Sequence, residues 1–200
     1  MTEMVHSLAV IVLAAGRSSR MGRAKQLEVV DGEAMVVRAA NLALGCEAAV
    51  TTVISGAYAE EVEQQLAQLI QTQGLQIVHN PNWAEGQATS VHTAIQSLPA
   101  TIEAALFLPV DQPFVTPGFL QSVIDCWQGG AELVAPKVDG EARGAPAIFA
   151  RKYFPELLQI QGDVGGRVVL MKHKNEVTWI AAEAKMLRDI DTPEDLLLSR

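Results

Sequence analysis

The sequence predicts a single α/β domain of the Rossmann-like type, in which a mostly parallel, mixed sheet lies between two layers of helices. Three observations predict this fold class. Short apolar runs typical of buried strands alternate with segments of helical periodicity, the connections between them are short, and 49% of the 200 residues are hydrophobic while 19% are charged. Repeated strand–helix units with short connections produce a parallel sheet that is covered on both faces.

The first part of the chain contains four strand–helix units. The expected strands are 8–13, 50–55, 75–80 and 104–111, and the helices that follow them are 34–45, 59–74, 90–98 and 116–127. In the second helix Val62, Leu66 and Leu69 share one face, and Gly74 supplies the C-terminal stop. Pro117 suits the first turn of the fourth helix because its φ angle is already helical.

After residue 136 the regular alternation ends. The expected elements around and beyond this point are a strand at 132–136, a strand that ends at 150, two short helices within 153–173, strands at 177–182 and 186–190, and a helix at 191–199. The two short helices are interrupted at Gly162, and Thr192 is expected to cap the last helix. We expect residues 137–200 to flank the sheet as an insertion that forms one wall of a site.

Composition excludes several classes of protein. The formal net charge of −8 argues against nonspecific nucleic-acid binding, which needs a basic surface. No basic segment precedes the apolar run 8–15, so we expect no signal peptide, and this run is too short to span a bilayer. Cys46 and Cys126 form no paired motif, and we expect both to be small buried hydrophobes of a cytoplasmic protein.

Positive charge gathers directly after the first strand, against the acidic balance of the chain. Around Gly16 and Gly22 lie four cationic residues, Arg17, Arg20, Arg23 and Lys25. The spacing matches neither a Walker A loop nor a dinucleotide fingerprint. Even so, Ser18, Ser19 and successive amides can form a nest around phosphates, whose charge Arg20 and Lys25 would neutralise. The alternative is a solvated basic loop without a ligand.

Carboxylates and polar groups follow other strands, and ligands of such sheets bind at the carboxyl ends of strands. Asp111 comes after an apolar strand, and Gln112 and Pro113 then turn the chain away. Oxygen ligands of this kind suit Mg²⁺, with Asp191 as a second candidate ligand. Asp111 could instead cap the next segment, and Asp191 lies in a good helix start by itself.

Two further loops carry candidate binding groups. In the loop after residue 79, Asn80, Gly86 and Ser90 could read the edge of a nucleobase, and Trp83 either stacks on the base or anchors the loop by packing. The histidines of the chain show no metal-ligand spacing. In the segment 162–168, Asp163, Gly165 and Arg167 could contact a polar, anionic acceptor, but they could equally end one helix and begin the next.

Six motifs occur together in a fixed order over nearly the whole chain: LAAGRSSRMGRAKQL, NPNWAEGQATS, PVDQPFV, GAPAIFAR, LQIQGDVGGR and DIDTPEDL. In this combination the chain resembles the NTP-transferase family of molybdenum-cofactor cytidylyltransferases. The wider superfamily contains guanylyltransferases for the same cofactor and cytidylyltransferases of isoprenoid synthesis. The resemblance implies a domain of the nucleotide-diphospho-sugar transferase type, with a nucleotide-binding core in residues 1–136 and an acceptor-side segment in residues 137–200.

The resemblance also implies roles for individual residues. Those that it implies for nucleotide binding are Leu13, Ala14, Ala15, Gly16, Asn80, Gly86 and Ser90, those that it implies for the phosphates, as catalytic cations, are Arg20 and Lys25, and the one that it implies for Mg²⁺ is Asp111. From the residue types alone we add Arg17 and Ser19 to the nucleotide site, Asp191 as a second Mg²⁺ ligand, and Asp163, Gly165 and Arg167 as contacts of the acceptor. The chain departs from the family where Gly144, Ala145 and Pro146 replace the common Gly-His-Pro.

The expected reaction moves CMP from CTP to the phosphate of molybdopterin and releases pyrophosphate. A phosphate monoester with a second pKa near ~6 is largely dianionic at neutral pH and needs no general base, which agrees with the lack of an evident catalytic histidine. Alternatives are GTP as donor, a sugar or polyol phosphate as acceptor, and a delivery protein that binds nucleotide and cofactor without turnover. A molybdoenzyme that receives the product is a further possible partner.

Overall fold

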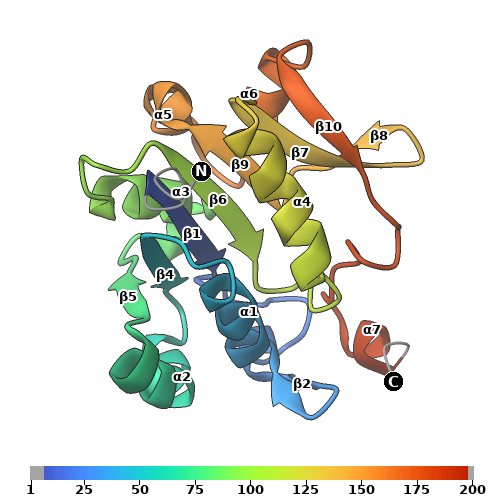
Figure 1. Ribbon diagram of the computed structural model, residues 1–200. Helices are drawn as coiled ribbons and strands as arrows, with labels where there is room; N and C mark the ends of the chain where they lie inside the picture. Colours follow the sequence, from blue (N-terminus) through green and yellow to red (C-terminus); the bar gives the residue numbers. More distant parts are fainter. Residues whose placement is uncertain (1–6, 198–200) are drawn as a thin grey trace.

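An eight-stranded, mostly parallel sheet forms the centre of the computed structural model, which describes residues 7–197 (Figure 1). Its strands are β1 Leu8–Leu13, β4 Val50–Ser55, β5 Gln76–His79, β6 Ala104–Pro109, β7 Leu133–Val138, β8 Glu141–Ala142, β9 Ala147–Ala150 and β10 Val177–Ala181. The order is β10-β7-β9-β6-β1-β4-β5, with β8 paired to β7. Only β8 and β9 run antiparallel to their neighbours. The α/β class and the mixed, mostly parallel sheet are therefore confirmed.

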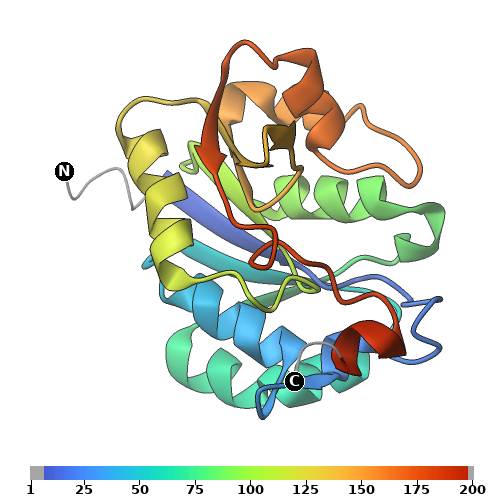
Figure 2. The same cartoon turned by 90° about the vertical axis from the view of Figure 1, so that its right-hand side faces the viewer.

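Helices cover both faces of this sheet, which gives the three predicted layers (Figure 2). On one face lie α1 Met35–Leu44, α2 Ala59–Gln73 and α4 Pro117–Gln128, and on the other lie α3 Gln87–Ser97, α5 Phe154–Leu157 and α6 Arg167–Lys172. Alternate residues of β1 enter the two cores, Val10 and Val12 on the first face and Ile11 on the second. Because both faces are buried, the strand is a continuous apolar run.

The strands and helices of the first part match their predicted positions closely. β1 and β4 have the expected bounds, α2 ends at Gly74 in the left-handed conformation with φ of 70°, and Pro117 is the first residue of α4. Helix α3 begins at Gln87, three residues before its predicted start at Ser90. A two-stranded antiparallel pair, β2 Val29–Val30 and β3 Glu33–Ala34, was not predicted.

The C-terminal segment differs most from expectation. It does not flank the sheet as an insertion, because β9 lies between β6 and β7 and β10 forms one edge. Ile148 is buried in one core and Phe149 in the other, which explains a central position for β9. Residues 186–190 form no strand. Their buried side chains, Leu187 and Ile190, are three residues apart and do not alternate as a strand requires.

Three smaller expectations concern the final helix, the cysteines and membranes. Helix α7 covers Pro193–Leu197, and the Oγ1 atom of Thr192 accepts a hydrogen bond of 3.3 Å from the Asp195 amide, as a cap does; residues 198–199 of the predicted helix lie outside the described residues. Cys46 and Cys126 are free thiols that are half-buried rather than buried, and burial raises the pKa of Cys46 to about 11. Within residues 7–197 no helix is long and apolar enough to cross a membrane.

A hydrogen-bonded cluster joins the end of α6 to α5. Both ring nitrogens of His173 face carboxylates, with Nδ1 2.8 Å from Glu176 Oε1 and Nε2 2.9 Å from Glu156 Oε1. The Tyr153 hydroxyl donates to Glu176 (2.9 Å), and the Lys172 ammonium donates to Glu156 (2.7 Å). The hydrogen bonds to Glu176 and then to Glu156 raise the pKa of His173, because both ring nitrogens can donate only in the imidazolium form.

This cluster predicts a pH-dependent contribution to stability. The His173 contribution is fully present below the unfolded pKa of about 6.5 and is lost as the pH rises through the raised folded pKa. We expect His173→Gln to lower the free energy of unfolding by urea more at pH 5.5 than at pH 8.5. His79→Gln, on the exposed side of β5, is the control and should show no such difference. An equal effect of His173→Gln at both pH values would contradict the assignment.

Candidate active site

A cavity of about 1170 Å³ opens at the carboxyl ends of β1 and β6. Leu13 pairs with Ile54 of β4 and with Pro109 of β6, so the loops after these three strands begin side by side. The predicted site residues that line the cavity are Leu13, Ala14, Ala15, Gly16, Arg17, Ser19, Arg20, Lys25, Gly86, Ser90, Asp111, Asp163, Gly165, Arg167 and Asp191. Residues from five separate parts of the sequence are thus brought together, and those that follow β1 and β6 lie at strand ends, as the rule for such sheets predicts.

A buried glutamine shapes the loop after β1. Gln26, which is 1% exposed, donates its amide hydrogens to the carbonyls of Ala14 (3.0 Å) and Gly16 (3.1 Å). The Ser18 hydroxyl donates to Gln26 Oε1 (3.1 Å), and Ser18 itself has a φ of 58°. These bonds give both carbonyls a hydrogen-bond partner within the protein. The amides of residues 15–17 have no hydrogen-bond partner within the described chain, so they are available to an anion.

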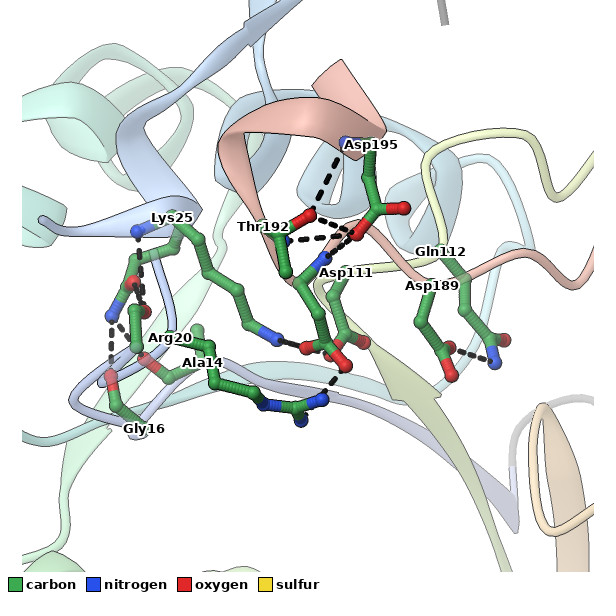
Figure 3. Close-up of polar contacts among 12 residues, drawn as sticks. Ala14, Gly16, Arg20, Lys25, Asp111, Gln112, Asp189, Thr192 and Asp195 are labelled. Carbon is green, nitrogen blue, oxygen red and sulfur yellow. Dashed lines mark hydrogen bonds and ion pairs between the residues drawn. The ribbon is translucent and has the colours of Figure 1, made fainter. Parts of the chain in front are cut away.

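Beside this loop, one ammonium joins two carboxylates (Figure 3). Lys25 Nζ lies 2.5 Å from Asp111 Oδ2 and 2.8 Å from Asp191 Oδ1. Arg20 Nη2 lies 2.8 Å from the other oxygen of Asp191. Burial alone lowers the pKa of Lys25, but the charge of Asp111 and the hydrogen bonds to both carboxylates outweigh it, and the pKa of Lys25 is raised. Lys25 is therefore a permanent cation, unsuited to act as a general base.

A third carboxylate, which the sequence did not single out, lies near this cluster. Asp189 accepts a hydrogen bond of 2.9 Å from the side-chain amide of Gln112, and both residues line the cavity. Burial, and then the negative charge of Asp111, raises the pKa of Asp189. In residues 7–197 no three His, Cys, Asp or Glu side chains come close enough to form a metal site by themselves. A divalent cation here would have two protein carboxylates, those of Asp111 and Asp191.

The two carboxylates fit such a cation by their chemistry. Their oxygens already converge on a single positive centre, the Lys25 ammonium. Mg²⁺ and similar hard cations are normally held by one or two carboxylates together with phosphate oxygens of the substrate. The remaining ligands would therefore come from a bound phosphate compound and from water.

Asn80 does not reach the cavity, unlike Gly86 and Ser90. It is completely buried, and its side-chain amide donates to Thr89 Oγ1 (2.9 Å) and Ser90 Oγ (3.0 Å). Its Oδ1 atom accepts a bond of 3.0 Å from the Asn82 amide. Asn80 therefore supports the loop and positions Ser90 instead of contacting a base. In the sequence, an asparagine at the end of a strand is compatible with base contact and with loop support, so the pattern could not separate these two roles.

Of the two roles considered for Trp83, the structure shows the packing, and stacking on a base stays a prediction. Its half-buried ring packs against the second core, and it also lines the cavity. The loop beneath it is tightly packed, because a Cβ atom at Gly56 would lie 2.8 Å from the Trp83 Cβ atom.

Two glycine-containing loops touch at the rim of the cavity. A Cβ atom on Gly86, which has a φ of 113°, would lie 2.4 Å from the backbone of Gly162. The Ala88 amide donates to the Gly162 carbonyl (3.1 Å), and Gly165 packs against the Gln87 side chain. Asp163 does not cap α6, whose N-cap is Gly166. The loop that carries Ser90 and the loop that carries Asp163 are therefore one packed unit.

The fold and the site together are typical of α/β domains that bind nucleotides, because unpaired amides and cations lie at the end of β1. The sequence model of the MobA-like NTP transferase domain matches residues 10–177. The chain belongs to this family and is thus a nucleotidyltransferase.

One curated relative and two solved structures are similar to the chain over nearly its whole length. The molybdenum cofactor cytidylyltransferase of Escherichia coli K12 is 26% identical over 191 residues, which cover 95% of this chain and 94% of that protein. The crystal structure of an rv0371c homologue from Mycobacterium sp. strain JC1 is 25% identical, with a TM-score of 0.78 and 97% of both chains covered. Rv0371c of Mycobacterium tuberculosis H37Rv, crystallised in complex with manganese, is 23% identical, with a TM-score of 0.81 and coverage of 96% and 97%.

The contact between the two rim loops predicts a specific sensitivity at Gly86. Gly86→Ala would force a Cβ atom into the Gly162 backbone at a positive φ, so we expect the free energy of unfolding to fall by about 1–3 kcal/mol. Gly118→Ala in α4 is the matched control, because nothing lies within 4 Å of its added Cβ atom. Urea unfolding measures both. Equal free energies of unfolding for the two variants would show that the contact between the two rim loops does not stabilise the fold.

Proposed function

We propose that this protein transfers CMP from CTP to the phosphate of molybdopterin or the molybdenum cofactor and releases pyrophosphate. The observation that carries the proposal is the cluster of Lys25, Asp111, Asp191 and Arg20 beside the unpaired amides of residues 15–17. Such a site offers fixed positive charge, backbone donors and two carboxylates to a triphosphate. The similarity to a protein named as a molybdenum cofactor cytidylyltransferase supports the choice of donor and acceptor.

The loop after β1 is suited to bind the triphosphate. The amides of residues 15–17 would donate to phosphate oxygens, with Arg17 and Ser19 beside them in the cavity wall. Arg20 and Lys25 would neutralise charge on the transferring and leaving phosphates. Gly86 and Ser90 line the part of the cavity assigned to the base and ribose, where Asn80 holds the Ser90 hydroxyl in position.

Asp111 and Asp191 would hold a divalent cation, which we propose to be Mg²⁺. When bound, this cation would polarise the reacting phosphate and offset charge on the pyrophosphate. The manganese complex of Rv0371c is consistent with a divalent cation in proteins of this fold. The backbone of Asp111 is held in place, because its carbonyl accepts a hydrogen bond of 2.9 Å from the Ile190 amide.

The acceptor needs no protein base. None of His79, His92 and His173 lines the cavity, and Lys25 remains charged. A phosphate monoester is largely dianionic at neutral pH because its second pKa is near ~6, and it can attack directly. Asp163, Gly165 and Arg167 lie in the wall on the acceptor side. A receiving molybdoenzyme and a cytoplasmic location are part of the same proposal.

The proposed activity predicts a specific product. Purified protein with Mg²⁺ and molybdopterin should release pyrophosphate with CTP much faster than with GTP, ATP or UTP, and mass analysis should find the cytosine dinucleotide of the cofactor. Preference for GTP would overturn the base assignment. Binding of nucleotide and cofactor without pyrophosphate release would identify a delivery protein instead.

Two matched variants connect this activity to the site. Asp111→Asn keeps the shape of the side chain and removes its charge, so kcat/KM should fall by about 10²-fold or more. The control is Asp125→Asn on α4. The Asp125 carboxylate accepts a hydrogen bond from the neighbouring Gln121 and does not line the cavity, so this variant should leave kcat/KM unchanged. Melting curves check that both variants are folded.

A further inference from the structure

The backbone of the loop after β1 is satisfied on one side only. The carbonyls of residues 14–17 each accept a hydrogen bond from another part of the protein. The donors are Gln26 Nε2 to Ala14 (3.0 Å) and Gly16 (3.1 Å), the Ala57 amide to Ala15 (3.1 Å) and the Tyr58 hydroxyl to Arg17 (3.2 Å). In the described part of the chain the amides of residues 15–17 have no hydrogen-bond partner. The fold therefore uses the acceptors of this loop and leaves three of its donors unused.

Peptide geometry connects these two observations. The carbonyl of one residue and the amide of the next share a plane, and in a trans peptide they point in opposite directions. The peptide bonds of this loop are trans. Because Gln26 holds the Ala14 carbonyl, it also fixes the Ala15 amide, which points away from the Gln26 side chain (Figure 3). In the same way, its bond to the Gly16 carbonyl fixes the Arg17 amide.

Gln26 has no capacity left for a ligand of its own. Its side chain is buried, both of its amide hydrogens donate to carbonyls, and its Oε1 atom accepts a bond of 3.1 Å from the Ser18 hydroxyl. The Ser18 hydroxyl oxygen in turn accepts a bond of 3.2 Å from the Lys25 amide. A buried amide is costly unless such bonds satisfy it, and here they do. Gln26 therefore acts through the loop and not by contact with a ligand.

We propose that Gln26 is a positioning residue for the phosphate end of the nucleotide, because it turns the amides of Ala15 and Arg17 into fixed hydrogen-bond donors. This inference rests on the proposed nucleotidyl transfer. A loop without the Gln26 bonds could rotate these peptide planes and present carbonyl oxygens, which repel phosphate. Fixing the planes before binding removes the cost of ordering them in the complex. Lys25 and Arg20 supply charge to the phosphates, and Gln26 supplies the direction of the backbone donors.

The test measures binding of inorganic pyrophosphate in the presence of Mg²⁺, so it does not require turnover. Gln26→Met keeps the length of the side chain and removes all three hydrogen bonds. The control is Val123→Ala. Val123 is buried in the first core and does not line the site cavity, so its truncation lowers stability without touching the loop. Calorimetry gives the dissociation constants, and amide signals of isotope-labelled protein in nuclear magnetic resonance spectra report hydrogen bonding at each residue.

We expect saturating pyrophosphate to shift the amide proton signals of Ala15, Gly16 and Arg17 downfield in wild type. Gln26→Met should bind pyrophosphate about tenfold more weakly and should lose the shifts of Ala15 and Arg17. It should keep the Gly16 shift, because the Ala57 amide still holds the carbonyl in that peptide plane.

The control variant should melt at a lower temperature and keep the wild-type affinity and all three shifts. The inference fails if wild type shows no shift at Ala15 and Arg17, or if Gln26→Met keeps its affinity and its shifts. It also fails if Gln26→Met loses the Gly16 shift with the other two, or if Val123→Ala loses as much affinity. Gln26→Asn takes the place of Gln26→Met if that variant is not folded, because its amide is one methylene too short to hold both carbonyls.

Kinetics of the transfer reaction give a second readout. A positioning role predicts that Gln26→Met raises the KM for CTP about tenfold and changes kcat less. A merely structural defect reduces the amount of active enzyme, which lowers kcat and leaves KM unchanged.

The outcomes separate this inference from the proposed function. If wild type transfers CMP from CTP and Gln26→Met has an unchanged KM for CTP, the inference fails and the transferase assignment stands. If Gln26→Met loses pyrophosphate affinity and the two amide shifts while wild type releases no pyrophosphate from any nucleotide, the role of Gln26 in phosphate binding stands and the proposed function fails.

Discussion

Asp111 and Asp191 lie 86 and 166 residues beyond Lys25 in the sequence, yet both accept a hydrogen bond from its ammonium. This contact joins the loop after β1, the end of β6 and the segment before α7 (Figure 3). Without the ammonium, two carboxylates would share one small region, where burial and then the negative charge of Asp111 already raise the pKa of Asp189. Lys25 contacts both carboxylates, whereas Arg20 contacts Asp191, so the pairing of Asp111 with Asp191 depends on the Lys25 ammonium.

Local sequence patterns predicted those parts of the fold and site that local chemistry determines. β1 is a continuous apolar run, β4 is rich in β-branched residues, and Gly74 and Pro117 mark helix ends through their own backbone preferences. The convergence of Lys25 and Asp111 followed from the topology of parallel sheets. Asp191 follows no strand in the structure, so this rule does not account for its position. The mutual pairing of the three side chains could not be predicted either, because strand ends are expected to meet without any indication of which side chains will touch.

What the sequence could not predict depends on contacts between distant segments. The position of β9 between β6 and β7 requires partners on both faces, and a short apolar run does not reveal them. Gln26 and Asn80 are polar residues whose roles depend on the carbonyls and hydroxyls that the folded chain brings to them. The exposure of Val168 and Met171 to the cavity could not be predicted either, because in the sequence they look like ordinary core residues of an amphipathic helix.

The central claim is that the carboxylates paired by Lys25 form the divalent-cation and phosphate end of a nucleotidyltransferase site. Titration of Mn²⁺ without nucleotide, followed by electron paramagnetic resonance, tests it directly in wild type and in Lys25→Met. Removing a cation that competes for both carboxylates should strengthen Mn²⁺ binding about tenfold or more, and adding Asp111→Asn should abolish the gain. Unchanged Mn²⁺ affinity in Lys25→Met, or a gain that survives Asp111→Asn, would contradict the account.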